Sequence, residues 1–146
     1  MTARLENRKP PTKGASKLSC EPRIGELDVS THIGEFCNAV VKSLNPPSLR
    51  LVQSGKSQIQ KVACVPGSGA SYIEAAARAG CDCLVTGDIK HHDALMAQAH
   101  GLALVDVTHT ATERAAVAMI ANALKNLHDV EVVQSEIDTN PFTKLV

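Results

Sequence analysis

Two residues in the second half of the chain have the types and the spacing of metal ligands. His109 and Glu113 stand four residues apart in the segment THTATE. Imidazole and carboxylate groups are ordinary ligands of zinc, iron and manganese, and residues at i and i+4 share one face of a helix. Thr110 and Glu113 also have the spacing of a capping box, in which the carboxylate accepts from the Thr110 amide. Spacing alone leaves both interpretations open.

A second polar segment, TGDIKHHD, runs from Thr86 to Asp93. Asp88 and His92 have i, i+4 spacing and could share one ion, whereas the adjacent His91 and His92 would point about 100° apart on a helix. The alternative makes Asp88 the N-cap of a helix and leaves the histidines at the surface or at the rim of a pocket. The sequence alone favours this second interpretation over metal binding.

A third segment, GSGAS, begins at Gly67 and ends at Ser71. Its glycines would let the backbone approach an anion, which the first amides of a following helix could bind. The segment lacks the third glycine of the dinucleotide fingerprint and the lysine of a phosphate-binding loop. A tight turn from strand to helix is therefore the favoured explanation.

Each of these segments follows a short apolar run typical of a strand and opens a stretch typical of a helix. Because the carboxyl ends of parallel strands share one edge of a sheet, where ligands bind, the three segments are expected to converge there. His109 and Asp88 would follow neighbouring strands, so their side chains could meet. The positions expected to line a ligand site beside them are Gly67, Ser68, Gly69, Thr86, Gly87 and Asp88.

The alternation of strand and helix patterns predicts an α/β domain, with helices packed on a largely parallel sheet of about five strands. The strands are expected at 49–52, 61–65, 82–85, 102–105 and 130–133. Helices are expected to include 33–44, 71–79, 89–100 and 117–127. Residues 1–19 are polar and are expected to form a disordered tail, with the domain spanning 20–146.

The composition excludes several classes of protein. Fifteen basic and fifteen acidic residues cancel, which argues against direct binding to nucleic acid, because that needs a clustered basic surface. No apolar run approaches the roughly 18 residues of a membrane span. The five cysteines are odd in number and match no common zinc pattern. We expect a reduced, cytoplasmic protein that does not act at a membrane.

The motifs in this order resemble the Nif-three-like proteins, also called GTP cyclohydrolase 1 type 2 homologues. The resemblance runs from about Arg23 to the end of the chain and covers the second half of the family's proteins only. RIGEL is similar to the family's entry into that half, and THTATERAAVAMI to its GH-x-ATE-R motif. The long segment VPGSGASYIEAAARAGCDCLVTGDIKHHDAL resembles its GGSG, TGE and HH stretches, and SEIDTNPF resembles the closing motif of its eukaryotic branch.

The resemblance implies a fold of two α/β halves in ring-shaped oligomers, with a two-metal site between the halves. Of the family's ligands, only a His and a Glu carry over, onto His109 and Glu113. The first half, with its other ligands, is absent from this chain. Asp88 stands where the family usually has Glu, and Thr108 where it often has Gly.

These observations give two hypotheses of different classes. The first is a divalent-metal-dependent hydrolase of GTP cyclohydrolase type 2 resemblance with an incomplete site, which when complete would hold up to two ions of the zinc, iron or manganese class. The second is a non-catalytic interaction or regulatory domain that keeps the fold and the oligomer contacts. Both predict a homo-oligomer, and the second also predicts a protein partner.

Overall fold

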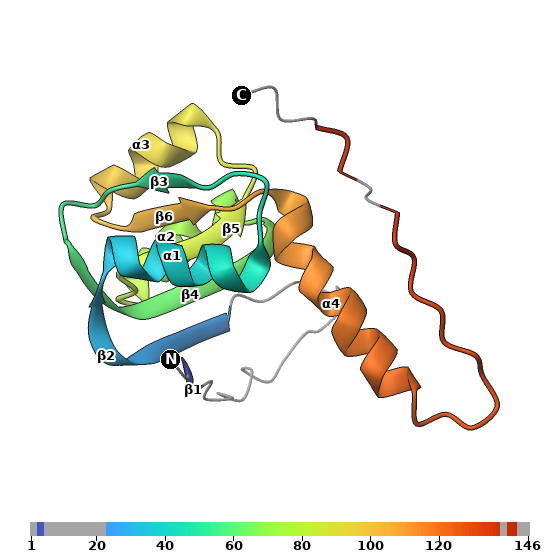
Figure 1. Cartoon of the computed structure of the whole chain (residues 1–146). Coiled ribbons are helices and arrows are strands. Elements are labelled where there is room, and N and C mark those ends of the chain that lie inside the picture. Colours follow the sequence, from blue (N-terminus) through green and yellow to red (C-terminus); the bar gives the residue numbers. More distant parts are fainter. Residues whose placement is uncertain (1–2, 5–22, 138–139, 143–146) are drawn as a thin grey trace, which may run out of the picture.

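The computed structural model describes residues 3–4, 23–137 and 140–142 as an α/β fold built on one mixed sheet. Its strands lie in the order β1-β2-β4-β5-β6-β3 (Figure 1). Their bounds are β1 Ala3–Arg4, β2 Arg23–His32, β3 Arg50–Val52, β4 Gln58–Ser68, β5 Cys83–Gly87 and β6 Ala103–Asp106. The helices are α1 Ile33–Leu44, the 3-10 helix η1 Ala70–Tyr72, α2 Ile73–Arg78, α3 His91–Ala99 and α4 His109–Leu124.

The α/β class is confirmed, but the prediction of a largely parallel sheet is wrong. Only the neighbours β4, β5 and β6 run parallel, because helices connect them and carry the chain back across the sheet. β2 lies antiparallel to β4, and β3 lies antiparallel to β6. The chain passes from β3 to β4 through the short loop 53–57 without a helix, so the two strands run in opposite directions.

The strand prediction differs from the structure at β1 and β2, which were not predicted, and at 130–133. The sequence does not predict β2 because only Leu27 and Thr31 are buried in it, so the alternation of apolar residues is weak. The strand predicted at 130–133 is absent, and Val130 and Val133 are exposed. Their β-branched side chains favour a strand, but α4 leads this segment away from the sheet, so it lacks a strand to pair with (Figure 1).

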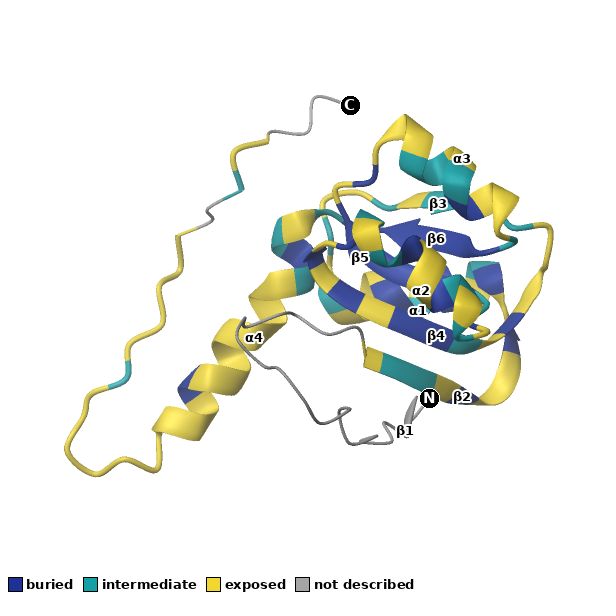
Figure 2. Cartoon of the chain, turned by 180° about the vertical axis from the view of Figure 1, so that it is seen from behind, coloured by how far each residue is buried: buried dark blue, intermediate teal, exposed yellow. Residues whose placement is uncertain are grey.

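The sheet has an apolar core on each face. α1 packs on one face through Phe36 and Val40, against Val62 and Val105 of the strands. α2 and α3 cover the other face, where Ile73 and Ala97 pack against Leu84 and Leu104 (Figure 2). β5 is buried along its whole length. The central strands are therefore fixed from both sides, which gives the polar turns at their ends a rigid base.

α4 differs from the other helices because most of it projects beyond the sheet (Figures 1 and 2). It contacts β4, β5 and α1, and its first turn holds Ala111 in the core. Its later residues are mostly exposed. The tail predicted for residues 1–19 lies outside the described residues, apart from Ala3–Arg4 of β1. None of the described helices is both long enough and apolar enough to span a membrane.

Candidate metal-binding site

The three polar segments meet at one edge of the sheet, as the sequence predicts. Ser68 at the end of β4 pairs with Gly87 at the end of β5, and Thr86 pairs with Asp106 at the end of β6. The turns that follow these strands carry Asp88 and His109. Segments about twenty residues apart in sequence therefore contribute to one cluster.

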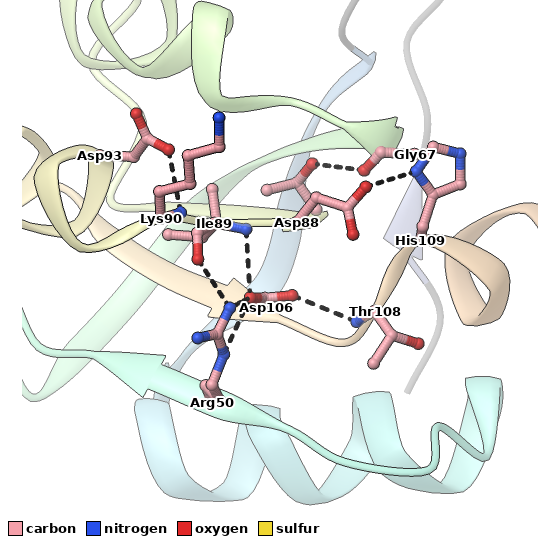
Figure 3. Close-up of polar contacts among 10 residues, drawn as sticks. Arg50, Gly67, Asp88, Ile89, Lys90, Asp93, Asp106, Thr108 and His109 are labelled. Atoms are coloured by element: carbon pink, nitrogen blue, oxygen red, sulfur yellow. Dashed lines mark hydrogen bonds and ion pairs between the residues drawn. The ribbon is translucent and has the colours of Figure 1, made fainter. Parts of the chain in front are cut away.

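Asp88, His109 and Glu113 form a continuous chain of contacts at this edge. Oδ2 of Asp88 lies 2.7 Å from Nδ1 of His109, and Figure 3 shows the two side chains pointing toward each other. On the opposite side of the same ring, Nε2 lies 3.2 Å from Oε1 of Glu113. Each of the three side chains is about half exposed, at 50%, 47% and 55%. The imidazole is thus held between two carboxylates and remains open to solvent.

The contact with Asp88 sets the protonation of the ring. A carboxylate only accepts hydrogen bonds, so the proton in this contact belongs to Nδ1. The hydrogen bond from Nδ1 to Asp88 raises the pKa of His109 above its ordinary value of 6.5, and the charge of Glu113 adds to the effect although partial burial opposes it. When the ring is neutral, Nε2 is an acceptor that faces the carboxylate of Glu113. A cation between these two atoms satisfies both.

The separation of Nε2 and Oε1 fits a metal ion as that cation. Two ligands of one tetrahedral zinc ion lie about 3.3–3.6 Å apart when the bonds to zinc are about 2.0–2.2 Å. The two atoms here are 3.2 Å apart, just below that range. Asp88 holds the other nitrogen of the ring, as carboxylates commonly do behind metal-binding histidines. Among the described residues, however, no group of three or more His, Cys, Asp or Glu side chains could hold an ion. The structure therefore brings two side chains of ligand type together, and among the described residues a third of these types is not grouped with them in a way that could hold an ion.

Gly67 is a glycine because it lies directly against these ligands. A Cβ atom at this position would lie 2.9 Å from Oε1 of Glu113 and 3.2 Å from Nε2 of His109, and its φ is +67°. Gly87 is crowded as well, since its Cβ would meet the His109 backbone nitrogen at 2.6 Å. Both glycines, which are also the positions predicted to approach a ligand, allow close approach between segments of this chain.

Hydrogen bonds fix the end of β4 to its neighbours. The Gly67 amide donates to Oγ1 of Thr112 at 2.7 Å, and the Thr86 hydroxyl donates to the Gly67 carbonyl at 3.1 Å. Thr112 also donates to the His109 carbonyl. The Gly67 amide is therefore occupied, whereas Ser68 is exposed and Gly69 is buried against Thr86. This arrangement favours the tight-turn interpretation of GSGAS.

The alternatives for the other two segments are decided by where the helices begin. α3 begins at His91 with Lys90 as its N-cap, so Asp88 is not the cap. Asp88 reaches His109 rather than a helix neighbour, while His91 and His92 are exposed. α4 begins at His109 with Thr108 as its N-cap. Thr110 is thus inside the helix, and the capping box proposed for it does not form the helix start.

A pocket of about 490 Å³ adjoins the cluster. Its walls include Asp88, His109, Thr110, Arg50 and Asp106. Neither Arg50 nor Asp106 is predicted from the sequence as a site residue. The signal for Asp106 was a single acidic residue directly after the apolar run LALV, two residues before the THT segment.

Comparison with known proteins identifies the family. The model of the Duf34/NIF3 family (NGG1p interacting factor 3) matches residues 14–141. The chain belongs to this family. It is 40% identical over 129 residues to a GTP cyclohydrolase 1 type 2 homolog of Halalkalibacterium halodurans, covering 83% of this chain and 34% of that protein. A homolog of the same name from Staphylococcus aureus is 36% identical over 124 residues, covering 82% of this chain and 34% of the relative.

A solved structure agrees with this assignment. The crystal structure of a Bacillus cereus protein related to NIF3 superposes with a TM-score of 0.71 at 30% identity, covering 85% of this chain and 36% of the other. The Duf34/NIF3 chain described here thus spans about a third of the length of these relatives. The predicted resemblance to the second half of the Nif-three-like proteins is confirmed at the level of the family.

Proposed function

We propose that this domain binds a divalent metal ion through His109 and Glu113 and serves a metal-dependent hydrolase as one half of its active site. The observation that carries the proposal is the pair of acceptor atoms, Nε2 and Oε1, 3.2 Å apart on one turn of α4. The carboxylate of Asp88 behind the imidazole supports it. Ions of the zinc, iron or manganese class suit these donors.

The chain's own residues have defined parts in such a site. Asp88 keeps the proton on Nδ1 of His109, so the lone pair of Nε2 points toward Glu113. Gly67 leaves the space in front of these two atoms free of a side chain. When bound, the ion would supply an activated water for attack on an imine-like or phosphate substrate. The pocket beside His109 would receive that substrate.

The incompleteness of the site is part of the proposal. Catalytic zinc commonly has three protein ligands, and this chain supplies two. The relatives named GTP cyclohydrolase 1 type 2 homolog are about three times as long as the matched region, since it covers 34% of each. We propose that a complete site, with up to two ions, draws its other ligands from outside the described residues.

Metal titration tests the proposal. Isothermal titration of the purified chain with Zn²⁺ or Mn²⁺, together with elemental analysis, should detect binding that His109→Ala and Glu113→Ala each abolish. His100→Ala is a matched control, because His100 is an exposed histidine at the end of α3. Equal binding by the wild-type chain and His109→Ala would reject these ligands.

The second candidate is a non-catalytic interaction domain. The observation that favours it is the exposed apolar surface of α4, where Val117, Met119 and Ile120 are 49%, 72% and 59% exposed. Exposed apolar patches mark sites of association, and we propose that the chain forms homo-oligomers through them. Light scattering should then give a mass above the monomer that Ile120→Asp reduces. Oligomers that persist without any metal binding would favour this candidate over the hydrolase.

A further inference from the structure

A buried carboxylate lies directly behind the metal-binding residues. Asp106, the last residue of β6, is 4% exposed. Its Oδ1 accepts a hydrogen bond from the Thr108 amide at 3.2 Å, and its Oδ2 accepts one from the Ile89 amide at 3.3 Å. Figure 3 shows these contacts radiating from one side chain. A single carboxylate therefore joins the turn after β5 to the turn after β6.

Both of these amides are one residue away from the site. Ile89 follows Asp88, and Thr108 precedes His109. The two turns are unusual, because Asp88 has a φ of +59° and Thr108 a φ of +73°. Residues other than glycine seldom adopt positive φ, and such conformations persist only where the surrounding structure fixes them. Asp106 supplies that fixing contact in both turns.

Arg50 completes the arrangement from the other side. It lies on β3 directly opposite Asp106 in the antiparallel ladder. Its Nε donates to Oδ2 of Asp106 at 3.1 Å, and its Nη2 contacts the same oxygen and donates to the Ile89 carbonyl at 2.7 Å. Ile89 is thus held at its amide by Asp106 and at its carbonyl by Arg50. The guanidinium also balances the charge of a carboxylate that would otherwise be buried without an opposite charge beside it.

We propose that Asp106 and Arg50 are positioning residues for the metal site, which align Asp88 with Nδ1 of His109 by fixing the two turns that carry them. This inference deepens the proposed function and rests on it. The simpler alternative is that the ion pair only attaches β3 to the sheet. β3 already has its own pairing with β6 at Leu51 and Val52, and the backbone partners of this ion pair lie in the two turns.

A matched pair of variants separates the two roles. Asp106→Asn keeps the shape of the side chain but removes its charge and puts an amide donor where one of the oxygens accepts. Asp82→Asn is the control, because Asp82 also accepts from two backbone amides, those of Gln60 and Lys61, and pairs with the exposed Lys56. Asp82 precedes β5, whereas the site lies beyond the end of that strand. If both carboxylates only support the fold, Asp106→Asn and Asp82→Asn should have the same effect on the His109 ring and on metal affinity.

The first measurement is the ¹⁵N spectrum of the His109 ring without metal, at a pH high enough to keep the imidazole neutral. The wild-type chain and Asp82→Asn should show the proton on Nδ1, and Asp106→Asn should show a mixture of tautomers. The second is Zn²⁺ titration, in which Asp106→Asn should lower the affinity roughly 10- to 100-fold, as expected for the loss of a supporting contact. Asp82→Asn should bind as the wild type does.

Arg50 gives an independent route if Asp106→Asn does not fold. Arg50→Ala should produce the same mixture of tautomers. Arg50→Lys should restore the proton to Nδ1 of His109 only in part, because the lysine ammonium lacks the paired donors of a guanidinium. If Asp106→Asn folds, an unchanged His109 tautomer in that variant would overturn the positioning role. If it does not fold, an unchanged tautomer in both Arg50 variants would overturn it. If the wild-type chain binds no Zn²⁺ but the variants still show the mixture of tautomers, the proposed function is rejected and the alignment of Asp88 with His109 remains supported.

Discussion

Nδ1 of His109 lies 2.7 Å from Oδ2 of Asp88, two residues that are 21 positions apart in the sequence. This contact leaves Nε2 directed at Glu113, and it fixes which nitrogen is available to an ion. The proposed chemistry of the site therefore depends on a residue that is not itself one of the two proposed ligands.

Replacement of Asp88 should weaken metal binding without removing the ligands. Asp88→Ala should lower the Zn²⁺ affinity roughly 10- to 100-fold, because the ring loses its orienting partner. The pKa of His109 should fall toward its ordinary value, since the hydrogen bond to Asp88 is the main cause of its rise. Titration calorimetry and NMR titration of the ring measure the two effects. Asp93→Ala, which alters the start of α3, is the control, and equal losses in both variants would contradict the orienting role.

The pH dependence of the site follows from the raised pKa of His109. Because its pKa is higher in the folded state, His109 binds its proton more tightly there than in the unfolded chain. Its contribution to stability is therefore fully present below about pH 6.5, the pKa in the unfolded chain. That contribution is lost as the pH rises through the higher folded pKa. Metal binding should show the opposite trend and strengthen over the same range, because an ion needs the neutral ring. Thermal melts and Zn²⁺ titrations across this range, with His109→Ala as the reference, test both directions; metal affinity that does not change with pH would contradict the assignment.

Substitution of Gly67 should disturb the site more than substitution of a glycine elsewhere. Gly67→Ala places a Cβ 2.9 Å from Oε1 of Glu113, and its backbone has a φ of +67°. Gly55→Ala is the matched control, since Gly55 has a φ of +87° with nothing within 4 Å of its Cβ. Each change should cost about 1–2 kcal/mol of unfolding free energy for the backbone alone. Denaturant unfolding and metal titration should show an added cost and a loss of metal affinity for Gly67→Ala only, and identical behaviour of the two would refute the crowding argument.

Asp82 should stabilise the fold independently of the site. Its carboxylate accepts from the amides of Gln60 and Lys61, each at 3.0 Å, and pairs with Lys56. Burial alone would raise the pKa of Asp82, but the hydrogen bonds from Lys61, Lys56 and Gln60 outweigh it and lower the pKa below 3.8. Asp82→Ala should cost about 1–3 kcal/mol, because two amides lose their acceptor.

The acid range tests the same contact. A lowered folded pKa means that the stabilisation by Asp82 is present above about pH 3.9, the unfolded value, and is lost as the pH falls through the folded value. The difference in unfolding free energy between the wild-type chain and Asp82→Ala should therefore shrink in acid. A difference that stays constant down to the lowest pH at which the protein folds would contradict the lowered pKa of Asp82.

The convergence of Asp88 and His109 could be predicted because both follow buried strands that helices join in parallel. The order of apolar runs and polar turns is enough for that inference. The strand order also predicts that the side chains of Asp88 and His109 could meet, and they lie 2.7 Å apart. The competing pairing of Asp88 with His92 could not be decided from the sequence. Asp88 was matched to His92 by helix spacing, but α3 begins only at His91, and the left-handed φ of Asp88 turns its side chain elsewhere.

The direction of the outer strands and the role of Arg50 were beyond the sequence pattern for a different reason. Periodicity identifies a strand but not its neighbour, and β3 pairs with β6 across 56 positions between Arg50 and Asp106. β2 gives almost no periodic signal, because most of its residues are exposed. The segment 130–133 gives a strong β-branched signal and yet stays unpaired. Whether a segment forms a strand depends on a sheet edge that can pair with it, and not on its residue types alone.

Arg50 belongs to a strand of three residues at the outer edge of the sheet. Short edge strands are among the first parts of a fold to open locally. When β3 separates from β6, the guanidinium leaves with it and Ile89 loses one of its two anchors. Transient fraying at this border would therefore loosen the turn of Asp88 while the central strands stay intact. The order of the imidazole would then depend on a three-residue strand at the edge of the sheet.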